Sequence, residues 1–345
     1  MGRHSACGRP GGADETTPTL TAFAAPRGGG TAPADGRVAL MRILLVGGTG
    51  FLGAAIARRL AATVVSPPEL ILPTRRPMRA RDLSVLPSAR VIAADVHDEA
   101  TLARLMAGCD AVISLVGILH GGEGQPYGAG FARAHVALPR LIGKVAARLG
   151  VRRVVHVSAL AADADAPSGY LRSKAAGENA LREAGCDLTI LRPSVIFGRG
   201  DSFLTLFAGL AGVAPFFPLA GANARFAPVW VEDVAAIAVE CLARPKSIGK
   251  AYSLCGPREY ALRELVSLAA RLSGHPRPVV PLPAAVAWMQ ALAMERLPVP
   301  PMTRDNLRSM RVPSVCPAGS TLPFGRVAMP LETVAPGYLS PPRSV

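Results

Sequence analysis

Residues 41–53 read MRILLVGGTGFLG, an apolar run that turns abruptly into glycines. Leu52, Ile56 and Leu60 then recur at helical spacing, so this stretch predicts a strand, a tight loop and a helix. A strand that opens directly into a glycine-rich loop and a helix is the context expected of a phosphate-binding turn. We therefore place the start of the fold at Met41.

The loop after this strand has the spacing GxxGxxG, with glycines at 47, 50 and 53. In this arrangement Gly47 permits the tight turn, Gly50 lets the backbone approach a pyrophosphate, and Gly53 lets helix and strand pack closely. The free N–H groups and the dipole at the helix N-terminus favour bound phosphates. The loop therefore predicts a dinucleotide site on a Rossmann-type domain.

Strands continue to alternate with helices as far as residue 193. The predicted strands cover residues 69–73, 90–94, 111–116, 154–158 and 188–191, and the predicted helices cover 101–106, 131–149 and 170–184. This alternation predicts the α/β class, with a Rossmann-type doubly wound parallel sheet and a smaller C-terminal α/β lobe. Ligands of such sheets bind outside the carboxyl ends of the strands, where the strand order reverses.

Composition divides the chain into three parts. Residues 1–40 are rich in Gly, Ala, Pro and Thr, and we expect a disordered extension, a mis-assigned start or a transit-type peptide. Residues 41–200 form the predicted NAD(P)-binding domain, to which the helix 231–243 returns. Residues 201–345, where proline is frequent, form the predicted smaller lobe for a substrate or partner, with 251–330 among its segments.

The formal net charge of +14 comes mainly from arginine. Such an excess attracts phosphates, anionic lipid or an acidic protein partner. The arginines are not clustered with aromatic residues and no nucleic-acid module is visible, so we expect no nucleic-acid partner. The six cysteines and six histidines are scattered without CxxC, HxH or HExxH patterns. This predicts reduced, packed thiols in a reducing compartment and no metal site.

The segment 203–222 contains no charged residue and is long enough to span a bilayer. Its glycines, and the Pro-Phe-Phe-Pro sequence at 215–218, would break a membrane-spanning helix. We therefore expect an apolar helix and loop that line a pocket or touch a membrane surface. The expected location is the cytoplasm, with peripheral contact at the inner face of the membrane as an alternative.

The end of the second predicted strand indicates which dinucleotide is bound. An acidic residue there would accept hydrogen bonds from the ribose 2′-OH of NAD, but the sequence has Arg75 and Arg76. Two guanidinium groups suit a 2′-phosphate, so NADP(H) is the preferred cofactor and NAD(H) the alternative. A pair of solvated surface arginines is the competing interpretation. Asp95, after the third strand, either bonds the adenine amino group or caps the next helix.

Ser158, Tyr170 and Lys174 form a candidate catalytic group. Tyr-x-x-x-Lys places two side chains one turn apart on the same helix face. We expect the Lys174 ammonium to lower the pKa of Tyr170 and to bond the nicotinamide ribose, while the phenol donates or accepts a proton. Ser158, at a strand end, would hold a substrate carbonyl or hydroxyl. A surface tyrosine stacked over a lysine stem is the competing interpretation.

Three segments carry a resemblance to a known family. They are the strand and glycine loop at 43–53, Leu-Arg-Pro-Ser-Val-Ile-Phe-Gly at 191–198, and Met-Thr-Arg-Asp-Asn-Leu-Arg-Ser-Met at 302–310. With them, the chain from Met41 to Leu339 resembles the extended or atypical short-chain dehydrogenase/reductase superfamily. In detail it is similar to bacterial relatives of the NADPH-binding accessory subunit of respiratory complex I, a subunit regarded as structural with a firmly held cofactor.

The resemblance implies that dinucleotide contacts extend along the whole sheet edge, with Pro193–Ile196 near the nicotinamide. The complete set of candidate contacts is Gly47, Thr49, Gly50, Phe51, Leu52, Gly53, Arg75, Arg76, Asp95, Val96, Val116, Gly117, Lys174, Pro193, Val195 and Ile196.

Three functions are compatible with these residues. The first is an NAD(P)H-binding protein associated with membrane redox enzymes such as complex I, with turnover undecided. The second is an active NADPH-dependent oxidoreductase, or an NAD-dependent epimerase/dehydratase, that acts through Tyr170 and Lys174 on a small or lipophilic substrate. The third is a non-catalytic regulatory module that senses NADPH.

Overall fold

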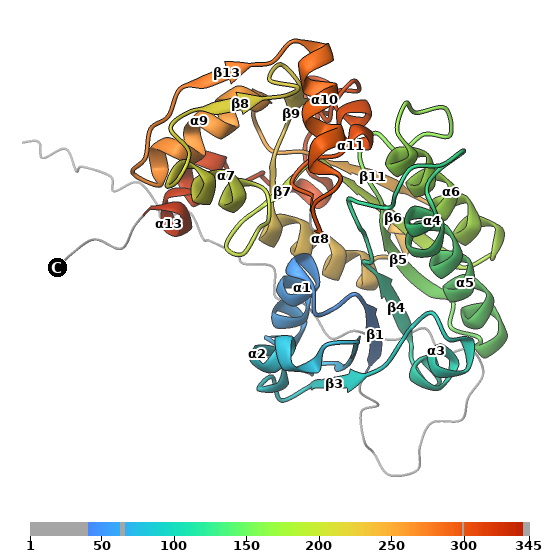
Figure 1. The fold of residues 1–345 in the computed structure, drawn as a ribbon. Coiled ribbons are helices and arrows are strands. Elements are labelled where there is room, and N and C mark those ends of the chain that lie inside the picture. Colours follow the sequence, from blue (N-terminus) through green and yellow to red (C-terminus); the bar gives the residue numbers. More distant parts are fainter. Residues whose placement is uncertain (1–40, 63–65, 299, 341–345) are drawn as a thin grey trace, which may run out of the picture.

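The computed structural model describes residues 41–62, 66–298 and 300–340, which form a seven-stranded sheet flanked by helices and a second, smaller lobe (Figure 1). The strand order is β11-β6-β5-β4-β1-β2-β3, and every neighbouring pair is parallel. This confirms the predicted Rossmann-type parallel sheet. The extension expected at 1–40 lies outside the described residues.

The central sheet is buried on both faces. Its strands are β1 (Arg42–Val46), β2 (Glu69–Thr74), β3 (Ala89–Ala93), β4 (Ala111–Ser114), β5 (Arg153–Val157), β6 (Asp187–Pro193) and β11 (Ala251–Leu254). Every residue of β4, and all of β1 after Arg42, is buried. Continuous apolar runs of this kind are expected where helices cover both faces of a parallel sheet.

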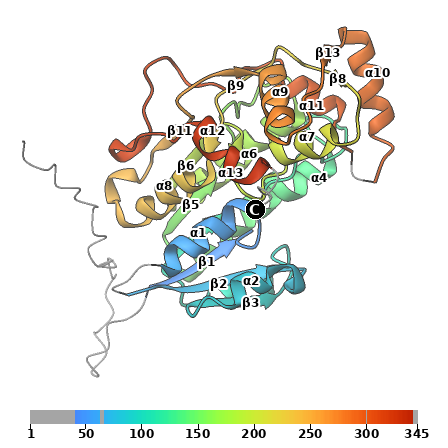
Figure 2. The same cartoon turned by 90° about the vertical axis from the view of Figure 1, so that its left-hand side faces the viewer.

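One helical layer consists of α1 (Phe51–Ala61) and α8 (Val231–Ala243), which pack side by side against the sheet (Figure 2). The other layer contains α3 (Glu99–Met106), α5 (Leu138–Leu149) and α6 (Gly169–Glu183). Short helices α2 (Arg81–Ser84) and α4 (Ala129–Phe131) precede β3 and α5, and a π-helical turn at Ala132–Ala137 joins α4 to α5. The helix expected at 231–243 is observed with these bounds.

The strand β11 corrects the expected division of the chain. The segment 251–330 was expected in the smaller lobe, but Ala251–Leu254 pairs in parallel with β6 and forms the edge strand of the main sheet. This edge strand reads Ala-Tyr-Ser-Leu, and only Leu254 is buried. It therefore lacks the continuous apolar run that identified the central strands.

The smaller lobe consists of short strands and helices around two apolar clusters. Its elements are β7 (Ile196–Phe197), α7 (Leu204–Ala211), β8 (Phe217–Leu219), β9 (Arg225–Phe226), β10 (Val229–Trp230), β12 (Tyr260–Ala261), α9 (Leu262–Leu272), β13 (Val279–Pro281), α10 (Ala284–Met294), α11 (Arg304–Ser309), α12 (Leu331–Val334) and α13 (Pro336–Leu339). The uncharged segment 203–222 folds into α7 and β8 within this lobe. None of the helices in the described ranges is long and apolar enough to cross a membrane.

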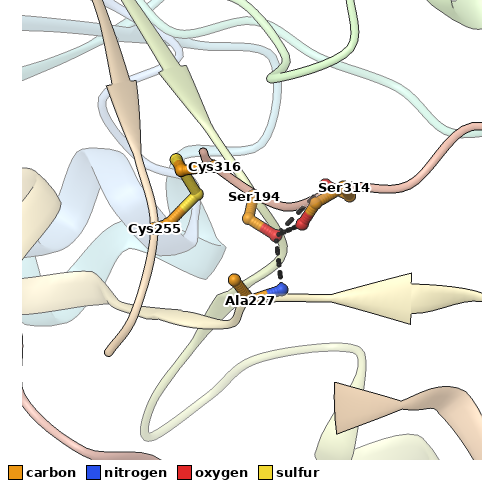
Figure 3. Close-up of a disulfide and its surroundings, with 5 residues drawn as sticks. All are labelled: Ser194, Ala227, Cys255, Ser314 and Cys316. Atoms are coloured by element: carbon orange, nitrogen blue, oxygen red, sulfur yellow. Dashed lines mark hydrogen bonds between the residues drawn. A yellow bond between two sulfur atoms is a disulfide. The ribbon is translucent and has the colours of Figure 1, made fainter. Parts of the chain in front are cut away.

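A disulfide contradicts the prediction that the cysteines are reduced. Cys255, just after β11, is bonded to Cys316 across 61 residues of chain (Figure 3). Closing a loop of this length contributes about 4 kcal/mol to the stability of the fold in the chain-entropy description. The pairing could not be predicted because neither cysteine belongs to a spaced motif. Cys109, Cys186 and Cys241 are free thiols, and Cys7 lies outside the described residues.

Candidate functional site

The candidate dinucleotide residues follow the carboxyl ends of neighbouring strands. In spatial order from β6 to β3, these ends lead to Pro193, Ser158, Val116, the glycine loop, Arg75 with Arg76, and Asp95. The strand order reverses between β4 and β1, so the glycine loop lies at the topological switch point of the sheet. An extended dinucleotide along this edge would place its adenosine toward β3 and its nicotinamide toward β6.

The glycine loop is shaped for close approach of backbone to a phosphate. Gly47 has a φ of +90°, which favours glycine, and a Cβ there would lie 3.2 Å from the backbone nitrogen of Val116. A Cβ on Gly53 would clash with the carbonyl oxygen of Gly47. Gly50 is exposed just before α1, where the N–H groups of the first helical turn face outward. These features fit a bound pyrophosphate.

The adenosine end of the edge is basic. Among the described residues, the exposed side chains of Arg75 and Arg76 have no ion-pair partner. Arg133 reaches Asp95 from the π-helical turn, with a 3.6 Å ion pair. Asp95 does not cap the following helix, because Asp98 is the residue whose carboxylate accepts the Thr101 N–H. The side chain of Asp95 instead accepts a hydrogen bond from the His97 N–H at 3.0 Å.

Lys174 and Ser158 lie together at the nicotinamide end. Lys174 is only 4% exposed, and its Nζ donates to the carbonyl oxygen of Val157 at 3.2 Å. A Cβ on Gly117 would be 3.3 Å from this Nζ, so Lys174 lies directly beneath the loop that follows β4. The Ser158 Oγ is buried and makes no hydrogen bond of ordinary geometry among the described residues, but it lies close enough to the Glu178 carboxylate to help lower the pKa of Glu178.

The environment of Tyr170 reverses one expectation. Its half-buried ring packs edge-on against Phe131 and His135, with centroid distances of 6.0 and 5.6 Å. Burial raises the pKa of Tyr170 to about 12, whereas we expected the Lys174 ammonium to lower it. The phenol therefore holds its proton more tightly than a free tyrosine does, which makes it a weaker acid.

Lys174 is buried at an electrostatic penalty that Glu178 partly offsets. Burial lowers the pKa of Lys174 to about 8, and the negative charge of Glu178 opposes that shift. Glu178 is fully buried one turn further along α6 and accepts hydrogen bonds from Arg192 at 2.8 and 2.6 Å and from Arg182 at 2.8 Å. Two neutral histidines, His135 and His156, also face this region, and burial lowers the pKa of each.

Replacing Lys174 with methionine should stabilise the chain while weakening dinucleotide binding. The folded-state pKa of Lys174 is below its ordinary value, so the unfolded chain holds more protons and stability rises from about pH 8 to about pH 10.5. We expect Lys174→Met to raise the free energy of unfolding by about 2 kcal/mol at pH 7. This gain should shrink toward pH 10.5.

Denaturant unfolding at pH 7 and at pH 10 measures this effect. The control is Lys144→Met, because Lys144 is exposed and pairs with Glu99 at 2.7 Å; it should change stability by less than about 0.5 kcal/mol. A Lys174→Met protein that is less stable than wild type at pH 7, or whose gain is independent of pH, would refute this account.

The segment after β6 is anchored from the C-terminal part of the chain. The Ser194 Oγ donates to the carbonyl oxygen of Ser314 at 2.7 Å and accepts from the Ala227 N–H at 3.3 Å (Figure 3). Cys316, two residues after Ser314, is held by the disulfide. The neighbouring Val195 and Ile196 are only partly buried. This anchoring fixes Pro193–Ile196 at the sheet edge.

Sequence reasoning missed several residues of the site. Glu178 and His135 escaped notice because a single glutamate or histidine on a helix carries no spacing signal. Asp305 could have been identified from the sequence, because it belongs to the segment 302–310 that supported the family resemblance. Its carboxylate accepts hydrogen bonds from the backbone N–H groups of Gly169 and Tyr170, at 2.7 and 3.0 Å.

Comparisons with known proteins agree with this geometry. Residues 47–245 match a family described as NAD(P)H-binding. The mitochondrial NADH dehydrogenase (ubiquinone) 1 alpha subcomplex subunit 9 of Mus musculus is 30% identical over 296 residues, which cover 84% of this chain and 75% of that protein. The ceramide reductase of Caulobacter vibrioides is 33% identical over 196 residues, 56% of this chain and 58% of that protein.

The solved structures give the same fold. A dTDP-glucose 4,6-dehydratase from Streptomyces venezuelae, crystallised with NAD and TYD bound, superposes with a TM-score of 0.61 at 26% sequence identity. The match covers 70% of this chain and 84% of that one. Folds of this kind bind dinucleotides at the carboxyl edge of the sheet, where the candidate residues of this chain lie.

Proposed function

This chain belongs to the NAD(P)H-binding family, with the fold of the atypical short-chain dehydrogenase/reductases, and from that premise we propose that it holds NADPH as its resident dinucleotide. The observation that carries the choice of NADPH is the pair Arg75 and Arg76 at the end of β2, whose side chains have no ion-pair partner in the described part of the chain. Two free guanidinium groups at this strand end suit a 2′-phosphate.

The proposed contacts follow the sheet edge. Gly47 to Gly53 would hold the pyrophosphate on the N-terminus of α1, and Asp95 with Val96 would flank the adenine. Lys174 retains N–H groups beyond its bond to Val157, and these would bind the ribose hydroxyls beside the nicotinamide. Pro193, Val195 and Ile196 would pack against the nicotinamide ring.

Association with a respiratory-chain complex or a membrane surface is part of this proposal. The mouse relative is named as a subunit of an NADH dehydrogenase. In the smaller lobe, the uncharged helices α7 and α10 expose large apolar side chains, which are continued by the residues that follow each helix. These side chains are Leu206, Leu210, Val213, Phe216, Val286, Met289, Leu292 and Leu297. These exposed side chains are the ones that would contact a membrane surface or a protein partner if the chain is a cytoplasmic protein that is peripheral at the membrane.

The second candidate function is reductase activity on a small or lipophilic carbonyl. It is favoured by the Lys174 Nζ, which bonds to the carbonyl oxygen of Val157 next to Ser158, and by Tyr170, which lies one turn before Lys174 on α6. The bound reduced nicotinamide would supply a hydride. Tyr170 would donate its proton to the carbonyl oxygen, and Ser158 would hold that oxygen by a hydrogen bond.

Tyr170→Phe separates the two functions. NADPH absorbance is followed with candidate carbonyls and quinones, and NADPH affinity is measured in parallel. For a reductase, we expect turnover to fall at least about 100-fold while the Kd for NADPH stays within about threefold. If NADPH stays bound and unconsumed in the wild type, and Tyr170→Phe behaves identically, reductase activity is excluded. The chain then binds NADPH without consuming it. A wild-type chain that binds neither NADPH nor NADH would refute both.

A further inference from the structure

A carboxylate distant in sequence from helix α6 caps the end that carries Tyr170. Asp305 in α11 is 6% exposed, and its two oxygens accept the N–H groups of Gly169 and Tyr170 at 2.7 and 3.0 Å. The local N-cap, Ser168, accepts only the Leu171 N–H through its side chain. First-turn N–H groups have no partner within their own helix, and here two of them are bound by a segment more than a hundred residues away.

The same segment is attached to the loop that follows β4. The Asn306 side-chain amide donates to the carbonyl oxygen of Leu119 at 3.3 Å, and Arg308 pairs with Glu123 at 2.9 Å. A Cβ on Gly169 would lie 3.2 Å from the Cα of Tyr127, so this loop passes directly over the start of α6. The segment therefore links the loop that begins at Gly117 to the helix that carries Lys174.

The position of the segment is itself fixed on its outer side. Arg304 and Arg308 both stack on the ring of Trp288 from α10, with guanidinium-to-centroid distances of 5.4 and 5.3 Å. Arg304 also pairs with Glu295 at 2.9 Å, and a capping box joins Thr303 to Asn306. Asp305 thus projects from a well-fixed turn toward α6.

We propose that Asp305 is a positioning residue that fixes the start of helix α6, and with it Tyr170 and Lys174, relative to the dinucleotide edge. This inference rests on the proposed function. Further along α6, Glu178 pairs with Arg192 and Ser173 is hydrogen-bonded to His135, whereas the first turn, which carries Tyr170, is bound from outside the helix by Asp305. A small displacement of this first turn would move Tyr170, and Lys174 one turn further on, away from the dinucleotide edge without unfolding the sheet.

The test compares Asp305→Asn with wild type below the unfolding temperature of both. Asparagine keeps one acceptor and presents an amide donor to the second N–H. We expect faster hydrogen exchange in peptides covering residues 168–172, an NADPH Kd that is about 10-fold higher, and loss of the bound-state change in nicotinamide fluorescence. Asp305→Ala, which removes both acceptors, should have the larger effect on all three.

The matched control is Glu264→Gln, which weakens a similar cap on α9, where the Glu264 carboxylate accepts the Ala261 N–H at 2.7 Å. This variant should leave NADPH binding unchanged. If Asp305→Asn loosens residues 168–172 but binds NADPH with wild-type affinity and fluorescence, Asp305 is only a stability residue and the positioning role is wrong. A wild-type chain that binds no dinucleotide would overturn the proposed function and the positioning role together.

Discussion

Replacing Gly50 with valine is expected to weaken NADPH binding at least about 100-fold, or about 2.7 kcal/mol, while the unfolding temperature changes little. Gly50 has φ −80° and ψ 176°, an extended conformation that any residue adopts. A Cβ there would meet only the carbonyl oxygen of Gly47, at 3.3 Å, so the fold accommodates the side chain with a small shift. The valine methyl groups would then occupy the space in which a phosphate approaches the N-terminus of α1.

Fluorescence titration with NADPH and thermal unfolding of the same samples measure both parts of this expectation. The control is Gly209→Val on α7, because Gly209 is exposed and a Cβ on it meets nothing within 4 Å. This control should bind NADPH as the wild type does. Wild-type affinity in a folded Gly50→Val protein would place the dinucleotide elsewhere and remove the glycine loop from the site.

Removing both Arg75 and Arg76 is expected to raise the Kd for NADPH about 100-fold and to change the Kd for NADH by less than about twofold. The two dinucleotides differ only in the 2′-phosphate. Neither guanidinium has an ion-pair partner among the described residues, so their replacement with alanine leaves no buried charge behind. The loss of binding free energy therefore measures the contact between the two guanidinium groups and the 2′-phosphate, and not a change in the stability of the fold.

The double variant Arg258→Ala with Arg263→Ala is the matched control. It removes the same charge from the smaller lobe, where both arginines line an open groove with residues of α9, and α9 lies at the opposite end of the molecule from β2 (Figure 2). Because the chain carries a formal net charge of +14, a general electrostatic attraction would respond to both double variants alike. Equal losses for NADPH in the two variants, or equal losses for NADPH and NADH in Arg75→Ala/Arg76→Ala, would contradict the assigned role.

The central sheet could be predicted because its strands and the helix α1 show their burial in short, continuous stretches of sequence. The apolar runs of β1 and β4, and the helical spacing of α1, follow directly from burial on both faces of a parallel sheet. The edge strand β11 escaped prediction because its half-exposed sequence looks like a loop. The Cys255–Cys316 disulfide escaped because two distant residues carry no signal of their proximity.

For the candidate site, the positions of the residues could be predicted from the sequence, but their charge environment could not. Residues at strand ends could be placed because the topology gathers carboxyl ends at one edge. The charge environment could not, because it depends on packing. Burial, which raises the pKa of Tyr170 and lowers that of Lys174, is set by Phe131, His135 and the covering loop. Asp305 reaches α6 from the smaller lobe, a contact that only the folded chain reveals.

Parallel calorimetric titrations of the wild-type chain with NADPH and with NADH test the central claim most directly. The account predicts one dinucleotide site per chain and a Kd for NADPH at least about 10-fold below that for NADH, because the arginine pair at the end of β2 contacts the 2′-phosphate. Equal affinities would contradict the preference for NADPH. Absence of binding for both would contradict the dinucleotide site itself.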